Sequence, residues 1–191
     1  MVQAVVMAGG ASRRLGQPKA LVPLLEGTLL SVSVHRLVKL GIETVVVVHP
    51  DLVADATDLP CRVVVNHRPD DGRTGSLQLG LAELSPPLSE VLVCPVDRPG
   101  WDGTVLDRLL ATPGEAVVPM HDGRAGHPLL VRGKALERLS LLAVDAPLRD
   151  ALDERAKVEV DAPFLHVNLD RPEDLTVMPA LAAWLMRGEN P

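Results

Sequence analysis

The chain leaves its first apolar run through the stretch Gly9-Gly10-Ala11-Ser12-Arg13-Arg14-Leu15-Gly16-Gln17-Pro18-Lys19. The run itself, Ala4-Val5-Val6-Met7, predicts a buried strand. A glycine-rich loop that follows a strand exposes backbone N–H groups, and such concavities bind anions. Arg13, Arg14 and Lys19 add positive charge to this loop, although the net charge of the chain is −6. The stretch therefore predicts a site for the phosphates of a nucleotide. The alternative is a glycine-rich turn with a solvated basic face.

The spacing of this loop differs from two common phosphate-binding loops. The Walker pattern has four residues between its glycines and then Gly-Lys-Ser/Thr, whereas Gly10 and Gly16 lie further apart and Gln17 follows. The Gly-x-Gly-x-x-Gly fingerprint of dinucleotide-binding folds is also absent from this stretch. Pro18 disfavours a helix that starts directly from the loop, because proline lacks an N–H and restricts the residue before it. We therefore expect the loop to wrap phosphates with both amides and side-chain cations.

Short apolar runs alternate with helical patterns along the first half of the chain. Valine-rich runs of this length suit strands that are buried on both faces of a parallel sheet. They predict strands at residues 44–48, 62–65 and 91–94, and helices at 29–40, 76–84 and 104–110. Gly41 stands where a helix C-terminus commonly needs a glycine. With right-handed crossovers, this order predicts a doubly wound α/β fold.

The pattern changes after residue 112. Short apolar runs at 116–119 and 129–131 are separated by a hairpin-like connection, which predicts a mixed sheet or a small β element over an acceptor substrate. Further on we expect helices at 135–142 and 147–155, a strand at 165–167, and a helix at 173–186 that Pro179 kinks or splits. Residues 1–191 are expected to form one domain, with a nucleotide-binding half at about 1–112 and an acceptor-binding half at about 113–191.

Composition excludes several other classes of protein. Hydrophobic residues make up 47% of the chain but aromatic residues only 2%, so the core is expected to consist of valine, leucine and alanine. The acidic balance, with no basic stripe outside the loop, argues against binding to nucleic acid or to an anionic membrane. No apolar segment is long enough to span a bilayer, and the start lacks the features of a signal peptide. Cys61 and Cys94 form no paired motif. We expect a cytoplasmic protein with reduced, buried thiols.

The spacing Gly-Gly-x-Ser-x-Arg-x-Gly-x-x-Lys resembles the signature of the MobA-like NTP transferases. This family includes the enzymes that attach GMP or CMP to the molybdenum cofactor. Further stretches resemble later motifs of the family, in the family's order, at residues 75–81, 96–99, 126–128 and 168–175. The resemblance implies a three-layer, Rossmann-like α/β fold with a mostly parallel sheet and a small antiparallel hairpin element in the C-terminal half.

The resemblance also implies a set of site residues. Lys19, Arg14 and Asp97 would be catalytic, and Asp97 and Asp170 would hold Mg²⁺. The nucleotide would contact residues of the first loop and of the later 75–81 stretch, namely Ala8, Gly9, Gly10, Ser12, Arg14, Lys19, Gly75 and Ser76. Asn168 and His127 are weaker candidates for contacts with the acceptor.

Asp97 follows the strand expected at 91–94, and open α/β sheets bind their ligands at the carboxyl ends of such strands. Mg²⁺ usually takes one or two protein carboxylates together with water and phosphate oxygens. The alternative for Asp97 is a cap on the next helix. Asp102 stands closer to the start of that helix and is the better cap, so we favour a metal ligand at Asp97.

Asp170 has two readings that stay open. Asp170 and Glu173 have the spacing of a capping box, which would stabilise a helix start by about 1 kcal/mol. The resemblance instead places a metal-coordinating side chain here, and we take Asp170 as the second ligand.

We expect a Mg²⁺-dependent nucleotidyltransferase that moves a nucleoside monophosphate from GTP or CTP to molybdopterin and releases pyrophosphate. No dedicated nucleophile is needed, because the second pKa of a phosphate monoester is about 6 and the acceptor is largely a dianion near neutral pH. Its product would pass to molybdenum enzymes in transient contacts. The alternatives are another phosphorylated acceptor, such as a sugar phosphate or an isoprenoid precursor, and an inactive nucleotide-binding regulator.

Two features leave the substrates open. Gly9 is similar to the guanylyl branch of the family, whereas the stretches at 75–77 and 126–128 look more like the cytidylyl branch. Arg98 departs from the family pattern, which has a neutral residue in the Asp-x-Pro segment. An additional cation next to Asp97 suits a different acceptor phosphate or a relative outside cofactor synthesis.

Overall fold

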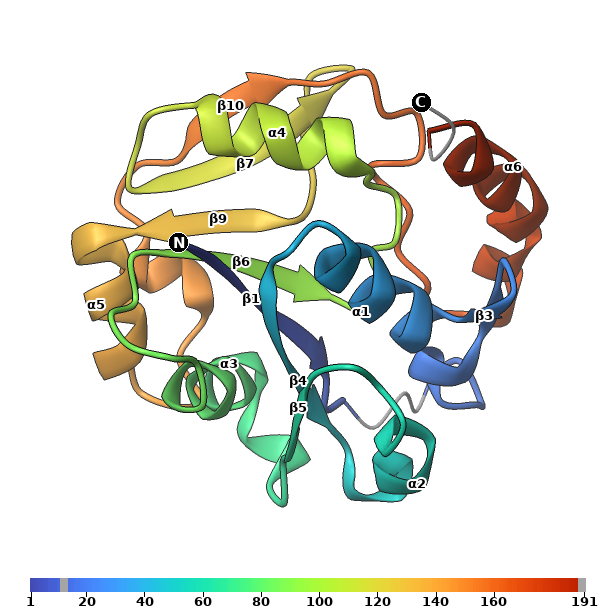
Figure 1. Ribbon diagram of the computed structural model, residues 1–191, viewed down its shortest axis with the longest axis horizontal. Coiled ribbons are helices and arrows are strands. Elements are labelled where there is room, and N and C mark those ends of the chain that lie inside the picture. The colour runs from blue at the N-terminus through green and yellow to red at the C-terminus, as the bar shows by residue number, and fades with distance from the viewer. Residues whose placement is uncertain (11–13, 189–191) are drawn as a thin grey trace.

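The computed structural model describes residues 1–10 and 14–188. One mixed sheet runs through the molecule in the order β10-β7-β9-β6-β1-β4-β5, with β8 paired to β7 (Figure 1). Its strands are β1 (Val2–Ala8), β4 (Glu43–Val48), β5 (Arg62–Val65), β6 (Glu90–Pro95), β7 (Ala116–His121), β8 (Arg124–Ala125), β9 (Leu129–Arg132) and β10 (Ala156–Glu159). A separate small hairpin consists of β2 (Pro23–Leu24) and β3 (Gly27–Thr28).

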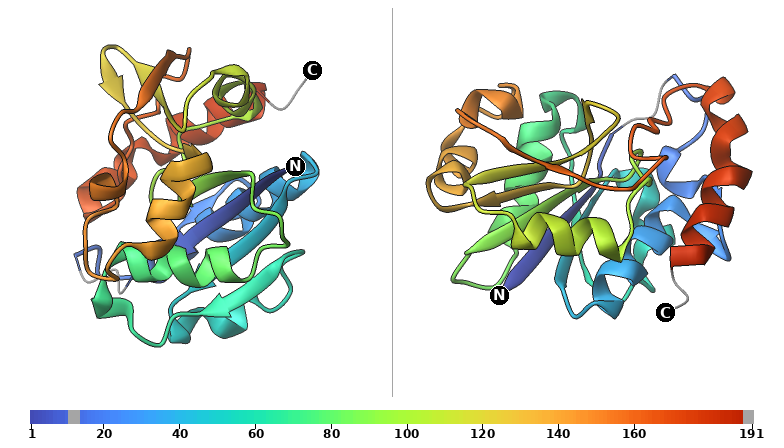
Figure 2. Two further views of the ribbon diagram at one scale, coloured as in Figure 1. Left: turned by 90° about the vertical axis from the view of Figure 1, so that its left-hand side faces the viewer. Right: turned by 90° about the horizontal axis from the view of Figure 1, so that it is seen from above.

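Helices cover both faces of the sheet, so the molecule has three layers (Figures 1 and 2). One core cluster joins the sheet to α1 (Leu29–Lys39), α2 (Val53–Ala56), α4 (Gly103–Ala111) and α6 (Met178–Gly188). The cluster on the other face joins it to α3 (Arg73–Ala82) and α5 (Gly133–Leu141). Short 3-10 turns complete the described chain, namely η1 (Lys19–Leu21), η2 (Pro50–Leu52), η3 (Pro69–Asp71), η4 (Leu148–Ala151) and η5 (Pro172–Val177). The predicted three-layer α/β fold is confirmed.

Strand directions follow the expected pattern. β1 pairs in parallel with both β4 and β6, and β4 with β5. β9 is antiparallel to β6 and to β7, as the hairpin-like connection between 116–119 and 129–131 predicted, and the short strand β8 within that connection also pairs with β7. The chain leaves β1 toward β4 and β5, and then returns to place β6 on the other side of β1. Such a reversal opens a crevice at the carboxyl ends of the strands, which is where open α/β sheets bind ligands.

Helix starts show why these segments form where they do. The hydroxyl of Thr28 accepts from the backbone N–H of Ser31 at 3.2 Å and caps α1. Asp102 caps α4 as predicted, since its Oδ1 accepts from the N–H of Val105 at 3.0 Å. Pro179 lies in the first turn of α6, directly after η5, so the predicted split of the last helix is confirmed.

In the C-terminal half, two sequence predictions were wrong and one strand was missed. Residues 165–167 are not a strand but part of a turn, in which Val167 donates to the carbonyl of Phe164 at 3.0 Å. Their apolar pattern reflects a loop anchored in the core, because Leu165 is fully buried. The helix expected at 147–155 is only the short turn η4. The polar strand β10, which pairs with β7 at the edge of the sheet, was missed.

The expected thiol state is partly confirmed. Both cysteines are free, and Cys94 is buried whereas Cys61 is partly exposed. Burial raises the pKa of Cys94 to about 12 and that of Cys61 to about 11. Neither thiol is therefore activated as a nucleophile. Among the described residues, no helix is both long enough and apolar enough to cross a membrane.

Candidate active site

A cavity of about 500 Å³ opens where β1 and β6 end, at the crevice that the topology predicts. Most of the predicted site residues of the described chain line it, although they come from distant parts of the sequence. The lining includes Ala8, Gly9, Gly10, Arg14, Lys19, Asp70, Gly72, Arg73, Ser76, Asp97, Arg98, His127, Asn168 and Asp170. Segments from both halves of the chain therefore meet at one site.

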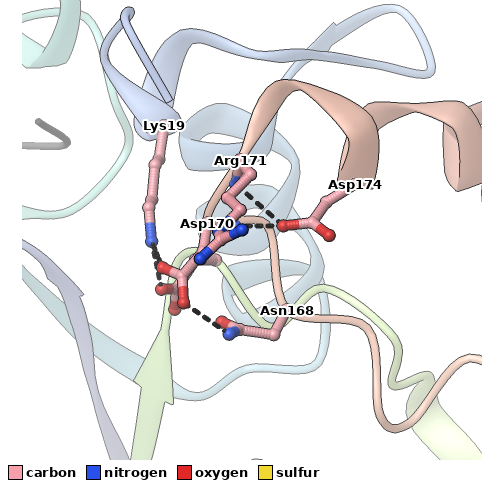
Figure 3. A network of polar contacts seen from close by, with 6 residues as sticks. Lys19, Asn168, Asp170, Arg171 and Asp174 are labelled. Atoms are coloured by element: carbon pink, nitrogen blue, oxygen red, sulfur yellow. Dashed lines mark hydrogen bonds and ion pairs between the residues drawn. The ribbon is translucent and has the colours of Figure 1, made fainter. Parts of the chain in front are cut away.

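Lys19 lines this cavity and makes polar contacts with two carboxylates (Figure 3). Its Nζ donates to Oδ2 of Asp97 at 2.9 Å and also to Oδ1 of Asp170. Lys19 follows the glycine-rich loop, Asp97 follows β6, and Asp170 precedes η5. One ammonium thus links two carboxylates that are far from it in sequence. The three side chains are only 15% to 34% exposed, so their charges interact more strongly than they would in open solvent.

The charges of this cluster stabilise one another. Burial would by itself lower the pKa of Lys19, but the hydrogen bonds to Asp170 and Asp97 and the negative charges of both carboxylates together outweigh it, and the pKa is raised above the usual value of 10.5. The hydrogen bond from Lys19 also lowers the pKa of Asp170, and Arg14 contributes to the same effect from nearby. Lys19 is therefore cationic and Asp170 anionic near neutral pH.

The carboxylate of Asp170 is not the cap of the helix that follows. Asp174 caps that turn instead, because its Oδ2 accepts from the backbone N–H groups of Asp170 and Arg171, each at 2.8 Å (Figure 3). The carboxylate of Asp170 turns to Lys19 and accepts from Nδ2 of Asn168 at 2.7 Å. The capping-box reading of Asp170 was therefore wrong.

Asp97 is similarly free of a capping role, since Asp102 caps α4. Its backbone carbonyl accepts from the N–H of Leu169 at 3.1 Å. This bond ties the end of β6 to the chain that carries Asn168 and Asp170. It helps to explain how two carboxylates that are distant in the sequence come to share one cationic partner.

The glycine-rich loop packs closely against α3. A Cβ atom at Gly9 would lie 3.2 Å from Oγ of Ser76 and 3.5 Å from the side chain of Asn66, so a larger residue would crowd both. Ser76 accepts a hydrogen bond from Nδ2 of Asn66 at 2.9 Å, and both side chains are buried. Ser76 and Asn66 therefore hold the first turn of the loop in place. No helix begins within residues 14–18 of the loop, which agrees with the prediction made from Pro18.

Two of the predicted nucleotide contacts need separate comment. Ser12 lies outside the described residues, as does Arg13. Gly75 does not line the cavity: its N–H donates to the carbonyl of Val144 at 3.1 Å, and it borders a second hollow between β5 and α3. Its neighbour Ser76 is the member of that pair that reaches the cavity.

Sequence reasoning missed three residues of the site. Asp70 and Arg73 line the cavity, and Asn66 supports Ser76 from behind. Asp70 and Arg73 flank Gly72, whose φ of 100° is in the region that favours glycine. The available sequence signal was the polar loop around Gly72, just before α3, but this pattern alone did not indicate that the loop lines the cavity.

The chemistry of the donor set fits a hard divalent cation. Both carboxylates contact a single atom, Nζ of Lys19, so they lie within reach of one small cation. Mg²⁺ commonly uses one or two carboxylates and completes its shell with water and phosphate oxygens. Within residues 1–10 and 14–188, no group of three or more histidine, cysteine or acidic side chains is placed to hold a metal by itself. A site of this kind would depend on phosphate ligands.

His127 provides a pH-dependent contribution to stability. Burial, followed by the positive charge of Arg98, lowers the pKa of His127 to about 4, while Arg73 and Arg155 act in the same direction and Asp97 opposes them. The unfolded chain therefore binds the proton first as the pH falls from 6.5 to 4. The free energy of unfolding should decrease by up to about 3 kcal/mol across that window.

Urea unfolding of the wild type and of His127→Gln between pH 7 and pH 4 measures this effect. The wild type should lose stability relative to the variant as the pH falls, whereas His35→Gln, at an exposed position on α1, should follow the wild type. Parallel curves for the wild type and His127→Gln would contradict the assignment.

Comparisons with known proteins agree with the geometry. Residues 4–160 match the model of the MobA-like NTP transferase domain. A protein of Paenarthrobacter nicotinovorans named nicotine blue oxidoreductase is 33% identical over 158 residues, covering 79% of this chain and 74% of that one. A probable molybdenum cofactor guanylyltransferase of Chloroflexus aggregans is 31% identical, with 94% of each chain covered. The crystal structure of Rv0371C of Mycobacterium tuberculosis in complex with manganese is similar with a TM-score of 0.71 and 23% identity, covering 93% of this chain and 97% of that one.

Proposed function

The chain belongs to the MobA-like NTP transferase family, and on that premise we propose that it transfers a nucleoside monophosphate from GTP or CTP to the terminal phosphate of a molybdopterin-type acceptor, with release of pyrophosphate. The observation that carries the proposal is the contact of Lys19 with Asp97 and Asp170 inside the cavity. That arrangement puts a cation for the phosphates next to two carboxylates suited to Mg²⁺.

The nucleotide triphosphate is held by the first loop. Gly9 and Gly10 line the cavity, where a glycine-rich loop offers backbone amides to an anion, and Arg14 and Lys19, which line it too, supply positive charge. As pyrophosphate leaves, negative charge accumulates around the α-phosphate, and fixed cations stabilise that charge. Asp97 and Asp170 would hold Mg²⁺, which supplies further charge neutralisation at the phosphates when it is bound.

The acceptor supplies the nucleophile. A phosphate monoester is largely a dianion near neutral pH, so one of its oxygens attacks the α-phosphorus without a general base. A P–O bond forms to the acceptor, the bond between the α- and β-phosphates breaks, and its electron pair leaves with pyrophosphate. The chain's own residues therefore act by orientation and charge neutralisation.

The two halves of the chain divide this work in our proposal. Residues 1–112 make most of the contacts with the nucleotide and residues 113–191 most of those with the acceptor, with Asp170 reaching back to the nucleotide side. The reaction takes place in the cytoplasm, and the product passes to molybdenum enzymes in transient contacts. The similarity to the probable guanylyltransferase of Chloroflexus aggregans favours GTP as the donor.

Pyrophosphate release measures the proposed activity directly. The purified protein is incubated with Mg²⁺, each of the four ribonucleoside triphosphates in turn, and molybdopterin as acceptor. We expect release with GTP or CTP that depends on molybdopterin. Release with a sugar phosphate or an isoprenoid phosphate would move the acceptor to another class, and nucleotide binding without release from any acceptor would indicate an inactive regulator.

The relative named nicotine blue oxidoreductase gives a second candidate function, a redox reaction. Hydride transfer is carried by a nicotinamide or flavin cofactor and not by side chains. Oxidation of NADH or NADPH in the presence of a quinone-like dye therefore separates the two candidates. The pairing of Lys19 with Asp97 and Asp170 favours phosphate chemistry, because a hydride transfer has no need of it.

A further inference from the structure

Arg98 and His127 both line the cavity, on chain segments that the pairing of β6 with β9 brings near each other. β6 and β9 are antiparallel, and Val93 pairs with Leu129. The chain that continues after β6 to Arg98 therefore runs beside the chain that leads through His127 into β9. Both residues line the cavity, next to Asp97.

Arg98 differs from Lys19 in having no anion of its own. Within the described residues, its guanidinium makes no hydrogen bond and no ion pair, although the residue is only partly exposed. A partly buried charge that lacks a counter-charge is costly unless a ligand supplies one. Next to it, Nδ1 of His127 is a buried nitrogen without a hydrogen-bond partner. The same edge of the cavity thus holds two polar groups whose bonding capacity is unused.

The cations that line the cavity come from different segments of the chain. Arg14 and Lys19 belong to the first loop, Arg73 begins α3, and Arg98 follows β6. A cavity with several cations suits a reaction that brings together two anionic substrates. Arg14 and Lys19 belong to the loop that we assign to the triphosphate, which leaves Arg98 for the acceptor.

We propose that Arg98, next to His127, binds the phosphate monoester of the acceptor and thereby selects acceptors that carry this group. The inference rests on the proposed function. A guanidinium binds phosphate through two parallel N–H donors, in a planar geometry that an ammonium does not reproduce. Two of the three terminal oxygens are then held, and the third is left to attack the α-phosphorus. The guanidinium also reduces the repulsion between the two phosphates as they approach.

Methyl phosphate is the probe for this site, because it carries the phosphate monoester and little else. Its titration into the protein is followed by backbone amide chemical shifts, with the wild type, Arg98→Gln and Arg98→Lys. The Arg98→Gln variant lacks the charged guanidinium, and a hydrogen bond to a charged group contributes about 1.5 kcal/mol or more. The dissociation constant of methyl phosphate should therefore rise by about 10-fold or more in this variant. Arg98→Lys should recover only part of the loss, and shifts should centre on residues 96–100 and 125–128.

Two controls make the result specific. Arg68→Gln removes an exposed arginine that borders the second hollow, and it should leave methyl phosphate binding within twofold of the wild type. Acetate, which carries one negative charge, should bind more weakly than methyl phosphate. Acetate binding of equal strength, or methyl phosphate binding to Arg98→Gln within twofold of the wild type, would overturn the assignment of Arg98.

A separate titration with Mg²⁺ and GTP or CTP distinguishes this inference from the proposed function. Arg98→Gln should change the nucleotide dissociation constant by less than twofold, and a larger increase with unchanged methyl phosphate binding would place Arg98 on the triphosphate and overturn the inference. Failure of the wild type to bind either nucleotide would instead contradict the proposed function, while the methyl phosphate result would still decide the role of Arg98.

Discussion

Replacement of Lys19 by methionine should lower turnover by about 10²- to 10³-fold and leave the fold intact, since removal of one fixed donor to a transition-state anion has an effect of that size. Methionine keeps most of the length of the side chain and removes only the ammonium that contacts Asp97 and Asp170. The initial rate of pyrophosphate release measures the effect, with circular dichroism as the check on folding.

The same substitution should have the opposite effect on metal binding. In the wild type, the ammonium of Lys19 lies between the two carboxylates that we assign to the cation. Without it, their mutual repulsion favours a divalent ion, so Mn²⁺ should bind the nucleotide-free variant several-fold more tightly, as measured by electron paramagnetic resonance. A merely structural lysine would not produce tighter metal binding together with lost turnover.

Lys134→Met is the matched control for Lys19→Met. Lys134 is exposed on α5, which follows β9. Arg132, at the carboxyl end of β9, pairs with Glu90 at the start of β6. The cavity lies at the other end of β6, so α5 begins at the opposite end of the strands from the cavity. This variant should match the wild type in both measurements. Turnover of Lys19→Met within threefold of the control would remove Lys19 from the proposed mechanism.

Replacement of Asp97 by asparagine should lower turnover by about 10³-fold, because a bound metal contributes several kcal/mol and each 1.36 kcal/mol is a factor of ten. Asparagine preserves the shape of the side chain and an oxygen that accepts from Lys19. Loss of the charge should also weaken Mn²⁺ binding, which electron paramagnetic resonance detects in the absence of any acceptor.

Asp107→Asn is the control for the charge of the chain, since Asp107 is exposed on α4. It should leave both turnover and Mn²⁺ binding unchanged. Asp170→Asn should weaken Mn²⁺ binding in the same direction as Asp97→Asn if both carboxylates hold the ion. Unchanged Mn²⁺ affinity in Asp97→Asn would contradict the metal site, whatever happened to the activity.

Local hydrophobic patterns were sufficient to predict the strands whose burial matches the apolar run in the sequence. Valine-rich runs predicted β1, β4 and β6, because strands buried on both faces must be apolar along their whole length, and a similar run predicted the half-buried edge strand β5. They failed for residues 165–167, whose apolar side chains fill the core from a turn, and for β10, a polar strand at the sheet edge with few buried side chains. Hydrophobicity reports burial, and burial does not by itself distinguish a strand from an anchored loop.

The sequence by itself determined the α/β layering and singled out Lys19 and Asp97, because a glycine-rich loop and polar residues after apolar strands are local features, whereas Asp170 was named from the resemblance to the family. It left the role of Asp170 open, since a capping box and a ligand have the same spacing. Only the tertiary structure decided that Asp174 caps the turn and that the Asp170 carboxylate faces Lys19. The same is true of Arg98 beside His127, because side chains distant in sequence are brought together by the pairing of strands, and that pairing is a property of the whole sheet.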